Sequence, residues 1–330
     1  MSSSLKIAFL GTGLMGKPMA GRLLAVGYDV AVWNRRADKA QALRTAGARV
    51  ATCVADALQG ADVVISMLAD GAAVAQVMAL ATTPAQSCPQ PANLQLAQSP
   101  LPQPFNQQAM PLPRGAIWLD MSSTRQSEAQ QFALQLAEFG AGFVDAPVSG
   151  GVLGAEAGSL AIMAGGSAHD YVRVQPLLQV LGRPTHVGAA GCGQLAKLCN
   201  QLIVGATLQV VAEALLLAQA GGADPAAVRQ AIRGGFAESR ILEVHGQRML
   251  ERNFMPGGQI KSQAKDMENI LLAAQAAGLE LPLAQMVAEQ YRQILPWAPQ
   301  ADQSAALLGL ERINPGLRLG QGADFLPDRG

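Results

Sequence analysis

Charged residues are scarce in this chain of 330 residues. Asp, Glu, Lys and Arg together make up 15% of it, against about 25% in typical globular proteins. The 24 basic and 24 acidic residues also balance, so bulk charge recruits neither a polyanion nor an anionic membrane surface. We therefore expect a small molecule as the partner, with no nucleic acid and no membrane.

Cysteine and histidine are scarce as well, with four and three residues. They show no CxxC pair and no Cys/His spacing typical of a metal site, so we predict free thiols and no metal. The apolar run 202–220 is interrupted by Gln209 and Glu213, and the first residues lack a basic segment followed by a cleavable hydrophobic one. These features predict a cytoplasmic protein.

Apolar residues are abundant and make up 50% of the chain, enough for about two domains at this length. The longest stretch that could form one helix runs over 191–221 and carries Lys197, with Asn200 three residues later. Residues i and i+3 share a helix face, so both side chains should project together from a helix that joins two domains.

A pattern typical of dinucleotide binding opens the chain. An apolar strand at 6–10 ends in the sequence GTGLMG, a helical pattern follows, and a second strand runs over 28–33. Between a strand and a helix, a GxGxxG turn directs backbone N–H groups at a pyrophosphate. The cofactor contacts predicted in this turn are Gly11, Thr12, Gly13, Leu14, Met15 and Gly16.

The end of the second strand indicates which dinucleotide fits. A carboxylate there would accept the ribose 2′-hydroxyl and repel a 2′-phosphate. The sequence has Asn34, Arg35 and Arg36 instead, and guanidinium groups suit a phosphate. We predict that NADP(H) is favoured over NAD(H), with a solvated helix start as the alternative role of the two arginines.

Two further buried strands, 61–68 and 116–121, end in small or polar residues. Ligands of a doubly wound sheet lie beyond the carboxyl ends of its strands, so Leu68 should contact the cofactor and Ser123 the cofactor or the substrate. Ser122 lies in the same loop, and capping of the helix predicted at 125–139 is an equal alternative for Ser122 and for Ser123.

A Ser-Gly-Gly turn, Ser149 to Gly151, follows a strand predicted at 142–147. The turn exposes a hydroxyl and the backbone N–H groups of Gly150 and Gly151, an arrangement that can hold a carboxylate. The alternative is a Gly-rich connection without a ligand.

The rest of the chain sets the predicted fold class: an α/β Rossmann-type N-terminal domain, a long interdomain helix and an all-α C-terminal domain. The Pro- and Gln-rich segment 82–114 has no helical or alternating period, which predicts a surface insertion. The predicted divisions are the Rossmann-type domain at 1–190, the helix at 191–221, the helical domain at 222–313 and a flexible tail at 314–330.

Four motifs resemble those of the β-hydroxyacid dehydrogenases, a family that includes 3-hydroxyisobutyrate dehydrogenase and tartronate semialdehyde reductase. They occur in the family's order. The motifs are the dinucleotide signature GTGLMGKPMA from Gly11, the substrate motif DAPVSGG from Asp145, the catalytic motif from Gly191 through Lys197 and Asn200, and the Lys-Asp pair Lys265–Asp266.

The resemblance implies a role for each matched residue. Lys197 would be the general acid/base, as a cleft lysine can be when hydride transfer needs a proton donor, and Asn200 would hold the substrate or the lysine. Ser149 to Gly151 would hold the substrate carboxylate, while Ser123 and Lys265 would contact cofactor or substrate. A surface ion pair with Glu268 is the alternative for Lys265.

The segments 230–235 and 252–257 are most similar to those of tartronate semialdehyde reductases. The resemblance therefore implies NAD(P)H-dependent reduction of tartronate semialdehyde to D-glycerate. Alternatives are 3-hydroxyisobutyrate dehydrogenation, succinic semialdehyde reduction, and a dinucleotide sensor without turnover. Imine reductases share the architecture but typically lack a lysine at the position of Lys197. The apolar surface of the long helix further predicts a homodimer or homotetramer.

Overall fold

The protein is described here by a computed structural model that places residues 5–81 and 112–327. The predicted insertion, 82–114, lies outside the described residues except for 112–114. The chain divides into two compact units, Met1–Lys197 and Leu198–Gly330. The domain boundaries predicted at 190, 221 and 313 stay predictions.

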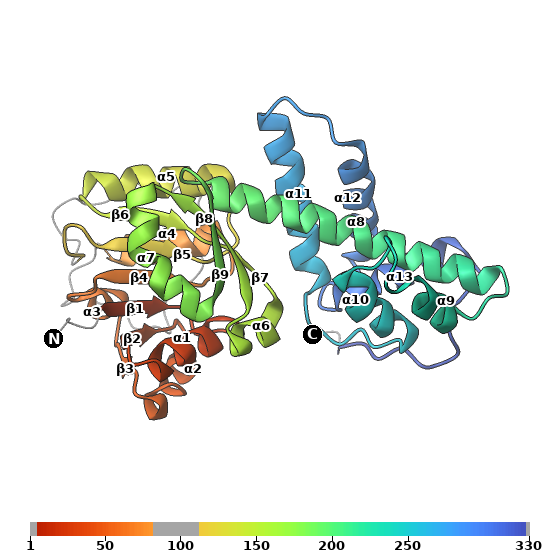
Figure 1. Cartoon of the computed structure of the whole chain (residues 1–330), viewed down its shortest axis with the longest axis horizontal. Helices are drawn as coiled ribbons and strands as arrows, with labels where there is room; N and C mark the ends of the chain where they lie inside the picture. Colours follow the sequence, from red (N-terminus) through yellow and green to blue (C-terminus); the bar gives the residue numbers. More distant parts are fainter. Residues whose placement is uncertain (1–4, 82–111, 328–330) are drawn as a thin grey trace. The chain divides into compact units, whose positions relative to one another are not determined.

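The first unit is built on one sheet, which has nine strands in the described residues. Their order is β3-β2-β1-β4-β5-β6-β8-β7, with β9 paired to β8 (Figure 1). Neighbours from β3 to β6 are parallel, whereas β8 runs antiparallel to β6 and β7. The strands are β1 Lys6–Leu10, β2 Asp29–Trp33, β3 Arg49–Val50, β4 Val63–Ser66, β5 Ile117–Asp120, β6 Gly142–Asp145, β7 Val148–Ser149, β8 Leu160–Gly166 and β9 Gly182–Gly188.

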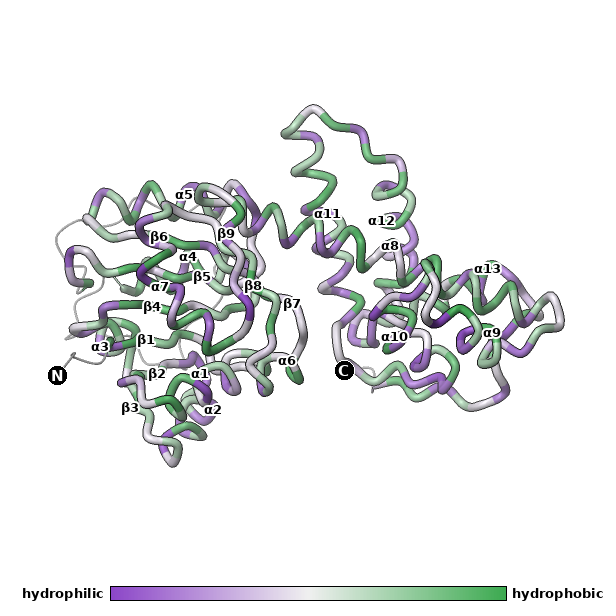
Figure 2. The backbone as a smooth tube through the Cα atoms, viewed as in Figure 1, coloured by the Kyte–Doolittle hydropathy of each residue, from purple (hydrophilic) through white to green (hydrophobic). Residues whose placement is uncertain are grey.

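Helices cover both faces of this sheet. In β1, alternate residues point to opposite faces, so Ile7 and Phe9 enter one core while Ala8 and Leu10 enter the other. The backbone of β1 and β4 is mostly hydrophobic, as its green colour in Figure 2 shows. The strands are accordingly continuous apolar runs, typical of parallel sheets buried on both sides. The helices are α1 Gly16–Ala25, α2 Ala37–Gln41, α3 Val54–Leu58, α4 Gly71–Ala81, α5 Gln126–Glu138, α6 Gly151–Ala157 and α7 Ala168–Leu181.

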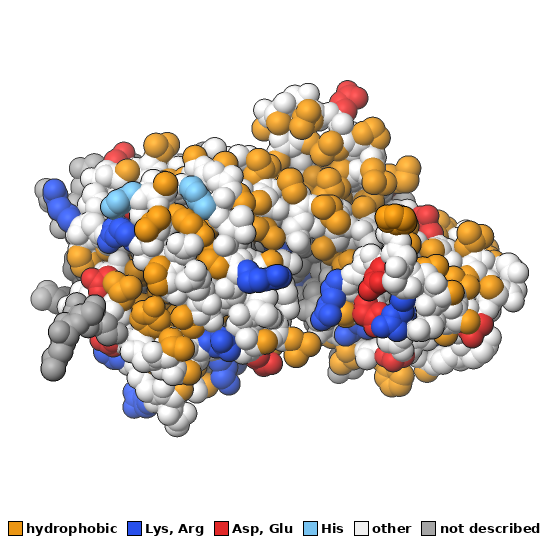
Figure 3. All heavy atoms as spheres, viewed as in Figure 1, with side chains coloured by type: hydrophobic (Ala, Val, Ile, Leu, Met, Phe, Trp, Pro, Cys, Tyr) orange, Lys and Arg blue, Asp and Glu red, His pale blue; other side chains and the backbone are white. Residues whose placement is uncertain are grey.

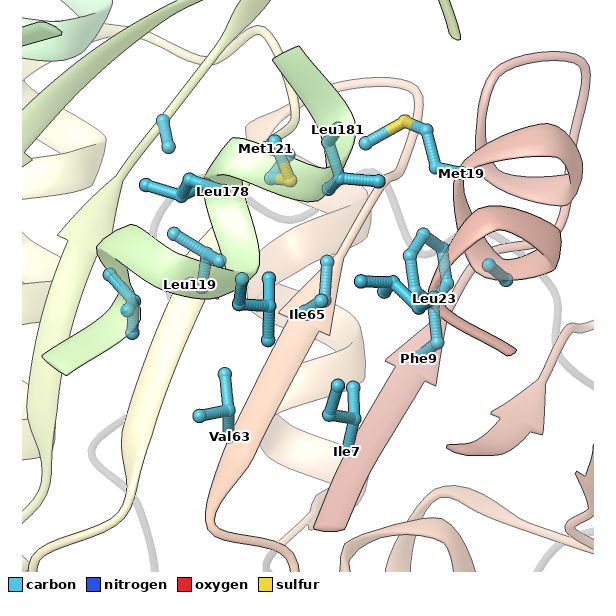
Figure 4. Close-up of a cluster of buried hydrophobic side chains, with 14 of the residues drawn as sticks. Ile7, Phe9, Met19, Leu23, Val63, Ile65, Leu119, Met121, Leu178 and Leu181 are labelled. Carbon is cyan, nitrogen blue, oxygen red and sulfur yellow. The ribbon is translucent and has the colours of Figure 1, made fainter. Parts of the chain in front are cut away.

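The core on the α1 and α7 side is shown in Figure 4. Side chains of the two helices lie against those of β1, β4 and β5: Met19, Leu23, Leu178 and Leu181 over Ile7, Phe9, Ile65 and Leu119. The strand order 3-2-1-4-5-6 and this two-sided cover define a Rossmann-type fold. The predicted α/β class is confirmed.

Helix α8, Cys192–Ala220, is the long helix predicted from the sequence, and it has 29 residues. Its first residues, through Lys197, belong to the first unit and the rest to the second. Among residues 5–81 and 112–327, it is the one helix long and apolar enough to span a membrane by length and composition, a test that the core helix of a soluble protein also passes.

The second unit is all-helical, as predicted. Leu208, Ala212 and Leu215 of α8 form its core together with residues such as Met267 and Tyr291 from later helices. Those helices are α9 Pro225–Ile232, α10 Arg240–Leu250, α11 Ile260–Ala276, α12 Pro282–Ile294 and α13 Ala306–Ile313.

The segment after α13 packs around one buried arginine. Arg252 is 1% exposed, and its guanidinium forms an ion pair with Glu311 at 2.8 Å and another with Asp324. It also donates to the backbone oxygen of Leu319 at 2.7 Å. These contacts involve the segment that the sequence predicts to be a flexible tail, and its mobility stays a prediction.

One expectation about cysteine is wrong. Cys53, the residue before α3, is disulfide-bonded, whereas Cys192 and Cys199 are free thiols. A disulfide depends on the approach of two Cβ atoms in space, which spacing along the chain does not report.

The start of α8 is packed too closely to the sheet for any side chain at Gly193. A Cβ atom there would lie 2.4 Å from the backbone oxygens of both Asp145 and Met163. We expect Gly193→Ala to lower the free energy of unfolding in urea by about 2 kcal/mol, the usual cost of overpacking.

Gly21→Ala is the matched control for that measurement. Gly21 lies inside α1, and a Cβ atom there would have its nearest neighbour, in the side chain of Leu43, 4.0 Å away. This change should therefore stabilise the helix by about 0.5–1 kcal/mol. Equal effects of the two substitutions would contradict the close approach at Gly193.

Candidate active site

The predicted dinucleotide turn connects β1 to α1 and is fixed by two glycines. Gly11 has φ +102°, and a Cβ there would lie 2.3 Å from the backbone oxygen of Met67. A Cβ on Gly16 would lie 1.9 Å from the backbone oxygen of Gly11. Only glycine fits at either position, and the turn can therefore enter α1 directly above the end of β1.

The outer side of the same turn is open. A Cβ on Gly13 would meet no atom within 4 Å, and Leu14, 81% exposed, projects into solvent. Thr12 is 2% exposed, and within the described residues its hydroxyl has no hydrogen-bond partner. An open backbone beside a buried, unpartnered hydroxyl fits a dinucleotide, which would supply acceptor oxygens to Thr12 and to the N–H groups through Met15.

Asn34 ties the end of β2 to this turn. Its Oδ1 accepts from the backbone N–H of Thr12 at 3.0 Å, and its Nδ2 donates to the backbone oxygen of Arg36 at 3.0 Å. Arg35 is exposed. Arg36 pairs with Asp38 at 2.9 Å, and this contact raises the pKa of Arg36. Two guanidinium groups thus stand beside the position expected for the adenosine ribose.

The ends of β4 and β5 are linked through Ser122. The Ser122 hydroxyl accepts from the backbone N–H of Leu68 at 2.9 Å. The N-cap residue of α5 is Arg125, so neither Ser122 nor Ser123 occupies that position. The backbone oxygen of Ser122 accepts from Gln194 Nε2 at 2.8 Å, and Gln194 Oε1 accepts from the N–H of Thr124 at 3.0 Å. Ser123, between them, is half-buried. The loop that was predicted to face the ligands is therefore tied to α8.

Asp145, at the end of β6, caps the N-terminus of α8. Its Oδ1 accepts from the backbone N–H of Gly191 at 2.8 Å and its Oδ2 from that of Gln194 at 2.7 Å. The side chain is fully buried. A carboxylate at this position satisfies two of the N–H groups that the first turn leaves unpaired, and it interacts favourably with the helix dipole.

Two buried carboxyl groups lie side by side here, because Asp120 of β5 is paired in register with Asp145 of β6. Burial raises the pKa of Asp145 to about 7, against the opposing effect of the Gly191 and Gln194 N–H groups. Burial also raises the pKa of Asp120 to about 6, although Ser122 and Ser66 donate hydrogen bonds to it. The neighbouring charge of Asp120 also raises the pKa of Asp145, and that of Glu128 raises the pKa of Asp120.

Lys197 lies one turn beyond this cap. Its Nζ donates to the backbone oxygen of Val148 at 2.9 Å, the residue before Ser149 in the predicted substrate motif. Ser149 ends β7, Gly150 has φ +138°, and α6 begins at Gly151 with φ +63°. The fold of the first unit therefore brings the predicted general acid/base and the predicted carboxylate cradle together.

The remaining predicted residues lie in the second unit. Asn200 Nδ2 donates to Gln201 Oε1 at 2.9 Å. Lys265 is paired with Asp266 at 3.5 Å, while Glu268 pairs with Arg292 at 2.7 Å. The alternative role of Lys265, an ion pair with Glu268, is therefore wrong.

Sequence reasoning missed the residues that hold the predicted ones in place, chiefly Gln194, Gln201 and Gln263. Gln194 lies three residues before Lys197, and Gln201 directly follows Asn200. The available signal was the presence of glutamines on an apolar helix, because an amide that becomes buried needs hydrogen-bond partners. The partners themselves could not be identified without the fold.

Two sequence-family profiles match the chain. Residues 6–90 and 104–193 match the NAD-binding domain of 6-phosphogluconate dehydrogenase. Residues 191–310 match a profile described as NAD-binding of NADP-dependent 3-hydroxyisobutyrate dehydrogenase. The two matches meet at the start of α8.

Curated relatives are similar over nearly the whole chain. This chain is 37% identical to the 2-hydroxy-3-oxopropionate reductase of Escherichia coli over 309 residues, which cover 93% of this chain and 97% of that protein. It is 33% identical to the 3-hydroxyisobutyrate dehydrogenase of Pseudomonas aeruginosa over 288 residues, which cover 84% of this chain and 88% of that protein.

Among solved structures, the 3-hydroxyisobutyrate dehydrogenase of Mycobacterium tuberculosis superimposes with a TM-score of 0.79 at 26% identity. The match covers 93% of this chain and 99% of that one. Fold, profiles and relatives agree, and the chain belongs to the 3-hydroxyisobutyrate dehydrogenase-like family of β-hydroxyacid dehydrogenases, which are NAD(P)-dependent oxidoreductases.

Proposed function

We propose that the protein reduces a small semialdehyde acid to the corresponding hydroxy acid, with tartronate semialdehyde and D-glycerate as the preferred pair. The observation that carries the proposal is the 2.9 Å contact of Lys197 Nζ with the backbone oxygen of Val148, beside Ser149. Identity of 37% to a 2-hydroxy-3-oxopropionate reductase supports this substrate.

In this proposal, the bound nicotinamide supplies the hydride, and the chain supplies the proton and the orientation. Lys197 donates a proton to the oxygen of the aldehyde as that oxygen gains negative charge. Asn200, one turn further along α8, shares the helix face of Lys197 and holds either the substrate or the lysine. In the reverse direction, Lys197 accepts the proton of the hydroxyl group.

The substrate carboxylate would be held by the Ser149 hydroxyl and the backbone N–H groups of Gly150 and Gly151. Both glycines have positive φ angles and form a tight turn, and successive backbone N–H groups of a turn can bind an anion. Ser123, Leu68 and Lys265 are proposed as further contacts with the cofactor or the substrate. A carboxylate anchored beside Lys197 fixes which carbon receives the hydride.

Lys197→Ala tests the proton donor. We expect kcat with tartronate semialdehyde to fall at least about a hundredfold, the usual contribution of a general acid, while NADPH affinity measured by fluorescence titration is unchanged. Lys6→Ala, an exposed lysine at the amino end of β1, is the control and should be fully active. Retention of more than about a tenth of the activity by Lys197→Ala would refute the role.

We also propose that NADPH is the preferred cofactor, because Arg35 and Arg36 follow β2 where an acidic residue would select NADH. Arg35→Ala should lower kcat/KM for NADPH about tenfold, by loss of one charge-assisted contact with the 2′-phosphate, and leave that for NADH unchanged. Lys39→Ala, exposed in α2, is the charge-matched control. A wild-type protein that uses NADH more efficiently than NADPH would contradict the preference.

A second candidate substrate is 3-hydroxyisobutyrate. The relative from Pseudomonas aeruginosa, 33% identical, carries that name, and other relatives are named for L-serine and 2-(hydroxymethyl)glutarate. One spectrophotometric panel distinguishes the candidates: NADPH oxidation with tartronate and succinic semialdehydes, and NADP⁺ reduction with 3-hydroxyisobutyrate.

A cytoplasmic location also stays a prediction from the sequence.

We further propose a homodimer or homotetramer. Ile203, Val210 and Leu217 of α8 are 67%, 57% and 73% exposed, and their spacing of seven places them on one side of the helix. Because Ile203 and Leu217 are equidistant from Val210, the stripe is self-complementary about a two-fold axis at Val210. Figure 3 shows hydrophobic side chains gathered over α11 and α12. The exposed apolar residues of these two helices include Leu272, Leu283 and Met286.

Val210→Glu tests this surface. The substitution would place two like charges at the centre of the interface. The mass measured by light scattering should therefore fall, to that of a monomer if the protein is a homodimer and to that of a dimer if it is a homotetramer. Val172→Glu, at a residue of α7 that is 62% exposed, should leave the mass unchanged. A monomeric wild-type protein would overturn the proposal.

A further inference from the structure

Four side chains connect α8 to α11 through a continuous set of hydrogen bonds. Asn200 Nδ2 donates to Gln201 Oε1 at 2.9 Å. Gln201 Nε2 donates to Asp266 Oδ2 at 2.8 Å and to Gln263 Oε1 at 3.0 Å. Gln263 Nε2 donates to the backbone oxygen of Gln201 at 3.0 Å. We call these residues, Asn200, Gln201, Gln263 and Asp266, the amide chain.

The two members of the amide chain on α11 are buried, and the two on α8 are half-buried. Gln263 is 1% exposed and Asp266 is 5% exposed. Gly205, one turn beyond Gln201, leaves the space that Gln263 occupies, because a Cβ there would lie 2.5 Å from Gln263 Nε2. An amide buried this tightly has no water as an alternative partner, so its hydrogen bonds decide its orientation.

Two acceptors independently fix the orientation of Gln201. The carboxylate of Asp266 accepts hydrogen bonds and cannot donate them, so the NH2 group of Gln201 must face it. The backbone oxygen of Gln201 is also only an acceptor, so Gln263 must turn its NH2 group there and its Oε1 toward Gln201 Nε2. Both constraints place Gln201 Oε1 on the side of Asn200.

The orientation of Asn200 follows from that of Gln201. Only the NH2 group of Asn200 can donate to Gln201 Oε1, which leaves Asn200 Oδ1 to accept from a different donor. An asparagine without these neighbours could rotate by 180° and exchange its oxygen and nitrogen at small cost. The amide chain therefore selects one of two faces of Asn200.

We propose that Gln201, Gln263 and Asp266 are positioning residues that hold Asn200 with its carbonyl oxygen as the acceptor at the reaction centre. The proposal rests on the proposed function of Asn200. An acceptor there binds an N–H of the Lys197 ammonium group or the hydroxyl of the hydroxy acid, and it would repel the carbonyl oxygen of the aldehyde. Asp266, the acid of the Lys-Asp motif, thus acts through Gln201 and touches no substrate.

Kinetics of paired variants test the positioning. Gln201→Leu and Asp266→Leu should each lower kcat about tenfold, the effect of losing about one hydrogen bond, with KM for NADPH unchanged. Asp266→Asn should stay near wild type, because its side-chain oxygen can still accept from Gln201 Nε2. Glu268→Gln, which removes a charge from the solvent side of α11, is the control. Equal losses in Asp266→Leu and Asp266→Asn would overturn the proposal.

A compensating pair gives the sharper result. Gln201→Glu introduces a carboxylate, which can only accept hydrogen bonds, and places it next to two other acceptors, the Asp266 carboxylate and Gln263 Oε1. We therefore expect kcat to fall at least about tenfold. Adding Asp266→Asn supplies an NH2 donor to that group, and kcat should recover at least threefold. A purely packing role predicts no recovery, so a double variant as slow as Gln201→Glu alone would refute the orientation.

The orientation can also be measured without turnover. In protein labelled with 15N-asparagine, the side-chain NH2 signal of Asn200 is identified by its loss in Asn200→Asp. It should shift in Gln201→Leu and stay in place in Glu268→Gln. An unchanged signal in Gln201→Leu would overturn the amide chain, whereas a shifted signal in a protein that reduces no semialdehyde would overturn only the proposed function.

Discussion

The cap of Asp145 on helix α8 is the contact on which the rest of the first unit's site depends. One carboxyl group accepts from the N–H groups of Gly191 and Gln194, and Gln194 then ties the end of β5 to the same helix turn. Lys197 follows one turn later and meets the backbone of Val148. Sheet edge and helix are thereby fixed together before any ligand binds, as a preorganised site requires.

The fold was predictable because its signals are local. A strand that ends in Gly11, with further glycines at the spacing of a dinucleotide turn, and long apolar periodicity after Gly191 follow from backbone sterics and burial. The disulfide of Cys53 was not predictable, since it depends on which thiols meet in space. The position of Ser122 was not either, because its partner Leu68 lies 54 residues away along the chain.

The residues of the candidate site could be proposed from the sequence, but only some of their contacts could. Lys197 and the turn at Ser149 could be inferred because the chemistry of hydride transfer needs a proton donor and an anion cradle. The partners that orient them could not, because Gln201 and Asp266 are separated by 65 residues and meet only through the packing of two helices. Periodicity indicates which face of a helix is buried, but not which buried polar groups face one another.

The contacts of Arg252 with Leu319 and Asp324 make the segment after α13 part of the second unit. The guanidinium of Arg252 is buried among groups from Glu311, Leu319 and Asp324, and a buried charge without partners is strongly unfavourable. A shortened protein ending at Ile313 would keep every helix of the unit yet lose two of those partners. Removal of this segment would therefore leave the Arg252 charge buried with too few partners, so the second unit needs residues 314–327 although they form no helix.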